Sequence, residues 1–469
     1  MSDTSSSRPP QAFWRALNVG RGHLDVRQQR VLVASVACLK ALFDRRDGAI
    51  ASDFTDAWTA FAHTITTTDL LFRRLADAGL PHLAYLHLAE TFRRVSHERS
   101  AGRTLDVYLE AIGEIAFPTP PLASALDFAA LVDSFFRGRA EESPTTPSAV
   151  TDLLIRLSYE PNATSYADPF AGIGNTLLRL ADLVENDAHL HGGESNKETW
   201  TLAAMACLLA RPRRIEVTYG DTLRQPPRDD RGAIARYDVI VADPPIGIKK
   251  WGYDSVDVER DERFGSFGTA LKNKGDLATV QHCLAAATHR AVVTTATSVL
   301  WRTTTVDKHV RSRWIEDDLL ESVILLPAGL RRDTQVRLAI LAFAKTPNAK
   351  PRGQVLFIDA SEADTQDRRK PELRTADVER ISGLVTAFRQ GRLSTGVVQE
   401  RFATVATAGE IAEKEYSLSL PLYVNLVVEV EMPITETLQA DLVYLRQRLR
   451  ESESSFDSVL QTLNAVNNN

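Results

Sequence analysis

The stretch that decides the fold is Tyr237-Asp238-Val239-Ile240-Val241-Ala242-Asp243-Pro244-Pro245-Ile246. Its uncharged, β-branched run after Asp238 is typical of a strand that is buried on both faces. Two prolines cannot continue a strand ladder, so the Asp243 side chain and the Pro244 carbonyl are expected at its carboxyl end. Open α/β sheets bind ligands at that edge. Two adjacent acceptors there suit an exocyclic amine that loses a proton as its nitrogen attacks a methyl donor.

Strand-like runs alternate with helix-like segments on both sides of this stretch, from about residue 148 to 360. The alternation predicts a doubly wound, mostly parallel α/β sheet. The last runs follow one another with little helix between them, which predicts an antiparallel edge. The expected strands are Ser165–Ala167, Ala188–Gly192, Arg214–Tyr219, Asp238–Ala242, Ala291–Thr295, Leu320–Leu326, Leu338–Ala344 and Val355–Asp359.

Helical patterns flank this α/β region. Residues 1–140 show apolar spacing of helical period without strand-like alternation, which predicts an all-helical domain. A polar, proline-rich segment near residue 141 marks the boundary of an α/β domain over 141–410, followed by a terminal segment over 411–469. That segment ends in a predicted long helix, whose apolar seam fits either a partner helix or the chain itself. The seam is Leu438, Leu442, Leu445, Leu449, Phe456, Val459 and Leu463.

Composition excludes several classes of protein. The 469-residue chain is 44% hydrophobic and 25% charged, and it has no apolar run of membrane-spanning length and no signal-peptide pattern at its start. Cys38, Cys207 and Cys283 lack metal-ligand spacing, so free thiols in a reducing cytoplasm are expected. The net charge of −6 argues against a surface that coats nucleic acid, although a local basic face remains compatible with it.

A glycine-containing turn is the second candidate for ligand binding. Asp168-Pro169-Phe170-Ala171-Gly172-Ile173-Gly174-Asn175 follows a predicted strand and opens a predicted helix. Gly172 and Gly174 allow a tight turn and the close approach of a ligand to the helix amino terminus. No Gly-Lys-Ser/Thr follows, so a phosphate-binding P-loop is not expected. Taken alone, the pattern fits an ordinary strand-to-helix turn equally well.

An acidic residue stands at or just beyond the end of each of four predicted strands. Glu194 stands where nucleoside-binding sheets hold ribose hydroxyls, and Asp221 stands where an acid can accept from an adenine amino group. Each alone is commonly a helix cap or a surface acid. Together with Asp168 and Asp243 they predict a nucleoside cofactor bound along one edge of the sheet.

At this point the chain resembles a known family. The order Thr146-Pro147, DPFAGIGN, Gly193-Glu194-Ser195-Asn196, Gly220-Asp221-Thr222-Leu223 and DPP resembles the amino-group DNA methyltransferases of the gamma arrangement. More narrowly, the chain resembles the modification subunit of type I restriction–modification systems over nearly its whole length. The resemblance implies a Rossmann-like methyltransferase domain that uses S-adenosyl-L-methionine.

The resemblance also implies roles for matching residues. Asp243, Pro244, Pro245 and Ile246 would form the catalytic motif, in which Asp243 and the Pro244 carbonyl accept hydrogen bonds from N6 of an adenine flipped out of double-stranded DNA. The residues that would bind the cofactor are Thr146 and Asp168 at its amino-acid end, Gly172 and Gly174 beneath it, Glu194 at the ribose, and Asp221 and Thr222 at the adenine, with Phe170 and Asn196 as further cofactor-binding residues.

The catalytic motif departs from the family at two positions. The family usually has Asn first and an aromatic residue after the prolines, where this chain has Asp243 and Ile246. Base–aromatic stacking is worth roughly 1–3 kcal/mol, so Ile246 predicts weaker capture of the base, unless Trp251 supplies the ring. Two readings follow: an adenine-N6 methyltransferase with an altered base pocket, or a weak or inactive module that binds DNA or cofactor in a defence or other complex. A protein, RNA or small-molecule acceptor is disfavoured by the multi-subunit resemblance.

DNA recognition is expected to need a partner, because the chain has no segment that reads as a target-recognition domain. The resemblance implies a DNA-specificity subunit and a second copy of the chain, and it leaves a motor nuclease subunit open. Lys249-Lys250 are well placed to meet phosphate near a flipped base, whereas three other basic clusters are expected in solvated loops. Those clusters are Arg211-Pro212-Arg213-Arg214, Arg311-Ser312-Arg313 and Arg368-Arg369-Lys370.

Overall fold

The computed structural model describes most of the chain. The described residues are 24–47, 57–92, 99–136, 146–184, 187–211, 214–257, 260–265, 268–331, 336–346, 349–362, 373–424 and 445–450. The chain divides into two compact units, Met1–Val424 and Asn425–Asn469. Within the described segments, no helix is both long enough and apolar enough to cross a membrane.

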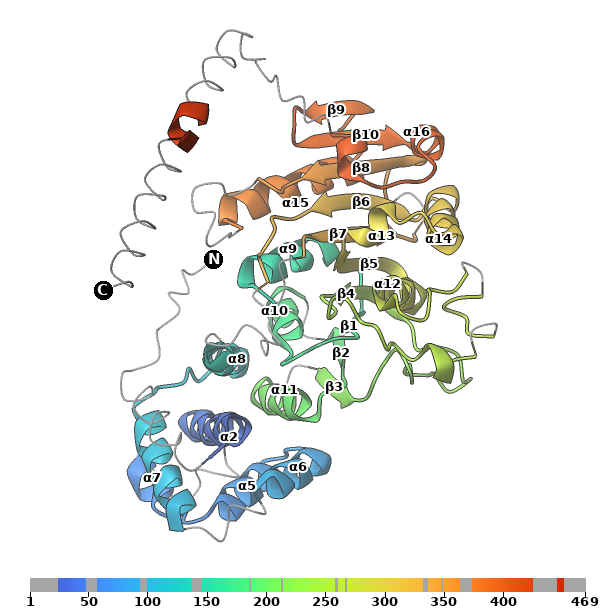
Figure 1. Ribbon diagram of the computed structural model, residues 1–469. Helices are drawn as coiled ribbons and strands as arrows, with labels where there is room; N and C mark the ends of the chain where they lie inside the picture. The colour runs from blue at the N-terminus through green and yellow to red at the C-terminus, as the bar shows by residue number, and fades with distance from the viewer. Residues whose placement is uncertain are drawn as a thin grey trace, which may run out of the picture. The chain divides into compact units, whose positions relative to one another are not determined.

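One ten-stranded sheet forms the centre of the first unit (Figure 1). Its strands are β1 (Ser165–Asp168), β2 (His189–Glu194), β3 (Ile215–Tyr219), β4 (Tyr237–Ala242), β5 (Ala287–Ala296), β6 (Leu320–Leu325), β7 (Leu338–Ala344), β8 (Gln354–Asp359), β9 (Gly396–Gln399) and β10 (Ala403–Thr407). Their order across the sheet is β3-β2-β1-β4-β5-β7-β6-β8-β10-β9. The first five of these run parallel, which confirms the predicted doubly wound sheet.

The strand order reverses between β1 and β4. The chain passes from β1 outward to β2 and β3, and then returns to place β4 on the other side of β1. Such a reversal opens a crevice at the carboxyl ends of the two central strands. Asp168 ends β1 and Asp243 directly follows β4, so both lie at this crevice.

Apolar side chains pack on both faces of the sheet. Along β4, Val239 and Val241 belong to one hydrophobic cluster, and Ile240 and Ala242 belong to the other. This alternation explains the uninterrupted apolar sequence, because neither face of the strand meets water. The helices that contribute to the first cluster are α9 (Ser148–Ser158), α10 (Asn175–Leu183), α11 (Lys197–Leu209) and α15 (Thr375–Arg389); those of the second are α12 (Gly275–Ala286), α13 (Ser298–Trp301), α14 (Thr305–Glu316) and α16 (Ala408–Glu413).

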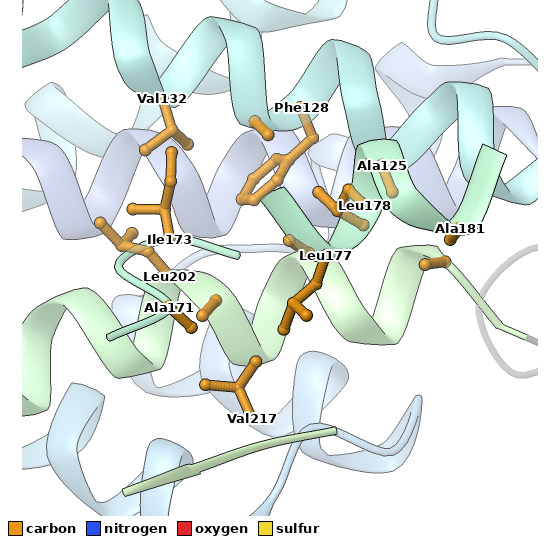
Figure 2. Close-up of a cluster of buried hydrophobic side chains, with 14 of the residues drawn as sticks. Ala125, Phe128, Val132, Ala171, Ile173, Leu177, Leu178, Ala181, Leu202 and Val217 are labelled. Carbon is orange, nitrogen blue, oxygen red and sulfur yellow. The ribbon is translucent and has the colours of Figure 1, made fainter. Parts of the chain in front are cut away.

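The described part of the amino-terminal region is helical, as predicted, and it packs on the sheet's own helices. Phe128 and Val132 of α8 lie against a layer that includes Leu177 of α10 and Leu202 of α11 (Figure 2). The amino-terminal helices therefore share the first hydrophobic cluster with the sheet. They are α2 (Val26–Asp44), α4 (Trp58–Ala62), α5 (Thr68–Asp77), α6 (His82–Phe92), α7 (Arg99–Gly113) and α8 (Pro121–Phe136).

The sheet continues beyond the strands that the sequence predicts. Antiparallel pairing among the last predicted strands is confirmed, because β7 is antiparallel to β5 and β6. Their expected place at the edge was wrong, because β6, β7 and β8 are interior and the edge on that side is β9. The sequence gives little sign of β9 and β10, because both are short and β9 is only partly buried. The described residues also form two 3₁₀ turns, η2 (Tyr253–Ser255) and η3 (Leu420–Leu422).

Only a short part of the predicted terminal helix is described. Residues 445–450 are helical, and within them Leu445 and Leu449 are 63% and 59% exposed. The other five residues of the predicted seam lie outside the described residues.

Candidate functional site

A cavity opens where the central strands end. Its volume is about 190 Å³, and residues that follow β1, β2, β3 and β4 line it. Nine of the predicted site residues meet there: Thr146, Asp168, Phe170, Gly172, Glu194, Asp221, Thr222, Asp243 and Pro245. Gly174, Asn196, Pro244 and Ile246 were also predicted, and they are not among the lining residues.

The turn after β1 forms the floor of the cavity. Gly172 and Gly174 have φ of 56° and 85°, in the left-handed region that favours glycine. The backbone N–H of Ala171 donates to the Gly193 carbonyl at 2.9 Å, which ties the turn to the end of β2. A Cβ atom on Gly193 would lie 2.5 Å from a methyl carbon of Thr222, so this approach requires glycine. Gly174 does not line the cavity, and its left-handed conformation shapes the turn.

Asp168 is the most deeply buried acid of the cavity. Its side chain accepts from the backbone N–H of Phe170 at 2.9 Å, and the residue is 2% exposed. Burial raises the pKa of Asp168 to about 8, and the nearby charges of Asp243 and Glu194 act in the same direction. At neutral pH the carboxyl is largely protonated, so a cationic ligand would favour its ionised form.

Glu194 and Asn196 have different structural roles at the end of β2. The carboxylate of Glu194 accepts from the backbone N–H of Asn196 at 2.6 Å, and burial raises the pKa of Glu194 above its usual value. The Asn196 side chain caps α11 by accepting from the N–H groups of Glu198 and Thr199. Asn196 thus positions the acid and the helix, and only Glu194 of the two lines the cavity.

The end of β3 is held by local hydrogen bonds. Asp221 accepts from the backbone N–H of Leu223 at 3.1 Å, and it pairs with the exposed Arg224 at 3.4 Å. Thr222 donates its hydroxyl to the Pro169 carbonyl at 3.0 Å, which joins this loop to the turn after β1. The floor and the β3 side of the cavity are therefore one connected structure.

Asp243 lies at the centre of a hydrogen-bond network. Thr146 donates to its Oδ2 at 2.6 Å, and Thr294 of β5 donates to its Oδ1. Arg331 Nη1 lies 3.4 Å from the same Oδ1 and donates to the Pro244 carbonyl at 3.1 Å. The carboxylate and the carbonyl therefore converge on one nitrogen, in the arrangement that the sequence predicts for an exocyclic amine.

Neither of the two hydrophobic candidates for the base pocket lines this cavity. Ile246 is half-buried and packs against the first hydrophobic cluster. Trp251 is 1% exposed, donates its indole N–H to the Leu271 carbonyl at 3.0 Å, and packs against Phe264. The sequence left open whether Trp251 supplies a ring to the base; in this structure its side chain is packed in the second hydrophobic cluster.

Two residues of the network were missed by sequence reasoning. Thr294 is a polar residue inside an apolar strand, and Arg331 follows β6 without a recognisable motif. The register of β4 with β5 brings Thr294 beside the residue after Ala242, which is Asp243. A weak signal for Thr294 existed, since most buried hydroxyl groups have a hydrogen-bond partner, although the neighbouring Thr295 has none. None was available for Arg331.

The predicted basic clusters differ in their exposure to solvent. Lys249 and Lys250 are exposed beyond the catalytic motif, and Arg224 donates to the Lys250 carbonyl at 3.3 Å. Arg311 was expected in a solvated loop; that was wrong, because it is 1% exposed and donates to backbone carbonyls, including that of Val299. Residues 212–213 and 368–370 of the other clusters lie outside the described residues.

Comparison with known proteins identifies relatives in the curated record. A methylase subunit of the type I restriction enzyme HindI from Haemophilus influenzae is 25% identical over 323 residues, 66% of this chain and 69% of that protein. The MjaVIII methylase subunit of Methanocaldococcus jannaschii is 26% identical over 322 residues, 66% of this chain and 53% of that protein. The chain thus spans about half the length of the second relative.

Solved structures share the fold of this chain, and a family model matches its sequence. A type I methyltransferase subunit from Streptococcus thermophilus superposes with a TM-score of 0.67 at 20% identity, covering 88% of this chain and 98% of that one. A modification subunit of a type I restriction enzyme from Vibrio vulnificus gives 0.65 at 15% identity, covering 92% and 100%. At these identities the likeness shows a shared fold. The family described as N-6 DNA Methylase matches residues 137–431, which is more than half of the chain. The chain therefore belongs to the N-6 DNA methylase family.

Proposed function

We propose that this chain transfers a methyl group from S-adenosyl-L-methionine to N6 of a flipped adenine in double-stranded DNA, together with a separate DNA-specificity subunit. One observation carries the proposal: Asp243 Oδ1 and the Pro244 carbonyl converge on a single nitrogen, that of Arg331. An adenine amine placed there would donate to both acceptors. Its lone pair would then be free to face the methyl donor.

The cavity's side chains fit the cofactor. When bound, S-adenosyl-L-methionine supplies a methyl group on a positively charged sulfur. Asp168, Glu194 and Asp221 make the lining acidic, which suits a ligand with a sulfonium and an ammonium group. By position along the sheet, Asp168 would pair with the ammonium, Glu194 would accept from ribose hydroxyls and Asp221 from the adenine amine.

Catalysis in this proposal depends on positioning and electrostatics. Thr146 and Thr294 hold the Asp243 carboxylate from two sides. That carboxylate would orient the amine, stabilise the positive charge that develops on N6, and accept its proton as the bond from nitrogen to the methyl carbon forms and the bond from that carbon to sulfur breaks. The Pro244 carbonyl fixes the second N–H, so the amine has one orientation.

A second candidate function keeps the fold and loses efficient transfer. The catalytic motif has no aromatic residue, and its Ile246 does not line the cavity. Arg331 contacts both acceptors. In this reading the chain binds cofactor or DNA as a module of a defence or other complex. The readings differ in one quantity, the rate of methyl transfer to DNA.

Partners are proposed on the same basis. The two relatives described above are methylase subunits of type I restriction enzymes, which supports a specificity subunit, a second copy of this chain and a motor nuclease as candidate partners. Leu445 and Leu449 are exposed on their helix, in the pattern expected of a surface that binds another helix. Exposed Lys249 and Lys250 would meet DNA phosphate.

Two measurements test the proposal. Calorimetry of the purified chain should show S-adenosyl-L-methionine binding, which Asp221→Ala weakens. Transfer of a tritiated methyl group to adenine in DNA, with a specificity subunit added, should be lost in Asp243→Ala while cofactor binding remains. Absence of cofactor binding would reject both readings. Binding without transfer would select the module, and transfer that survives Asp243→Ala would overturn the site assignment.

A further inference from the structure

Arg331 holds the position that the substrate amine would need. Its Nη1 donates to the Pro244 carbonyl at 3.1 Å and lies 3.4 Å from Asp243 Oδ1. The pair is largely shielded from water, with side-chain exposures of 12% for Arg331 and 5% for Asp243. Hydrogen bonds to charged groups are stronger than neutral ones, so this contact competes directly with an incoming base.

If a free adenine nucleoside displaced Arg331, the two acceptors would regain a donor, but the guanidinium would not regain an anion. The nucleoside's amine would satisfy Asp243 and the Pro244 carbonyl, but the displaced guanidinium would give up a carboxylate and gain only water. A nucleotide within a DNA strand brings an amine and phosphates together. A guanidinium pairs well with phosphate, which would replace the carboxylate as its anion.

From these contacts we infer that Arg331 is a specificity-determining residue that makes base binding an exchange. The amine of the flipped adenine takes the place of Nη1, and a backbone phosphate of the same strand takes the guanidinium. Arg331 thereby selects nucleic acid over free nucleosides, which would otherwise enter the open cavity. The inference rests on the proposed function, because it uses the same amine acceptors.

The test measures ligand binding to the full chain by calorimetry, with the cofactor cavity saturated with S-adenosylhomocysteine so that adenine ligands cannot bind there. The two ligands are 2′-deoxyadenosine and 2′-deoxyadenosine 3′,5′-bisphosphate. The variants are Arg331→Met, which keeps the stem without the donors, and Arg331→Lys, which keeps the charge. Arg337→Met is the matched control, because Arg337 is an exposed cation near the start of β7.

Wild-type chain is expected to bind the bisphosphate about tenfold more tightly than the nucleoside. Arg331→Met should bind the nucleoside about tenfold more tightly than wild type, and should lose most of the preference for the bisphosphate. Arg331→Lys should restore part of that preference, and Arg337→Met should behave as wild type.

The outcomes separate this inference from the proposed function. If S-adenosylhomocysteine fails to bind wild-type chain, the proposed function fails. If it binds every variant, the fold and cofactor site are intact in each. An unchanged nucleoside affinity in Arg331→Met, or no binding of either adenine ligand by any variant, then overturns the inference alone. A preference for the bisphosphate that persists in Arg331→Met would assign phosphate binding to other cations, and would overturn it as well.

Discussion

Thr294, a fully buried residue of β5, donates its hydroxyl hydrogen to the carboxylate of Asp243 at the end of β4. The donor fixes the carboxylate from the sheet side, opposite the cavity residue Thr146. Catalysis that depends on orientation is sensitive to such contacts, because a misplaced group costs rate without costing cofactor affinity.

Thr294→Val should therefore lower the rate of methyl transfer about tenfold, the order of one charged hydrogen bond, with cofactor affinity unchanged. Thr295→Val is the matched control, since the Thr295 hydroxyl is buried without a hydrogen-bond partner. Single-turnover rates and calorimetric cofactor titration provide the two readouts. Equal rates in both variants would show that Thr294 does not position Asp243.

The acidic strand ends could be predicted from sequence because each belongs to a local pattern. An apolar run followed by Asp-Pro, or by a glycine-rich turn, marks where a strand ends. Parallel topology then places such ends at one edge of the sheet. The cavity brings Asp168, Glu194, Asp221 and Asp243 together in this way.

The rest of the network could not be predicted, because its partners are distant in sequence. Thr294 and Arg331 are 51 and 88 residues from Asp243, and only the strand register and the loop after β6 bring them close. Trp251 is a further example. It lies close to the catalytic motif in the sequence, but that closeness does not indicate whether its ring faces the cavity or is buried. Asn196 was predicted among the cofactor-binding residues, and in the structure its side chain caps α11.

Asp168 should make stability depend on pH. Burial raises the pKa of its carboxyl from 3.8 to about 8 in the folded chain, so between these values the folded state holds a proton that the unfolded state has released. The contribution of Asp168 to the free energy of unfolding of the cofactor-free chain should therefore fall as pH rises from about 4 to about 8, by up to about 1.4 kcal/mol per pH unit. Measured by urea denaturation across this range, the unfolding free energy of Asp168→Asn should fall less, or rise more, with pH than that of wild type. An identical slope in the variant would contradict the assignment.

The same carboxyl should release a proton when S-adenosyl-L-methionine binds. At pH 6.5 the Asp168 carboxyl is mostly protonated, because its pKa is about 8, and pairing with an ammonium group favours its ionised form. Binding heat should then be more exothermic in Tris than in phosphate, because Tris releases more heat when it takes up the proton. Asp168→Asn should bind more weakly and lose the buffer dependence. A buffer dependence retained by Asp168→Asn would place the proton on another group.

Two cavity glycines should respond differently to the same substitution. A Cβ on Gly193 would lie 2.5 Å from a methyl carbon of Thr222 and 3.1 Å from the Pro169 carbonyl oxygen, whereas one on Gly220 would meet nothing within 4 Å. Gly193→Ala should therefore separate the turn after β1 from the β3 loop, at a cost of about 1–3 kcal/mol in unfolding free energy, and should weaken cofactor binding. Gly220→Ala should stay within about 0.5 kcal/mol of wild type. Urea denaturation and calorimetry of both variants provide the comparison. Matching losses in the two variants would mean that the contact of Gly193 with Thr222 does not shape the cavity.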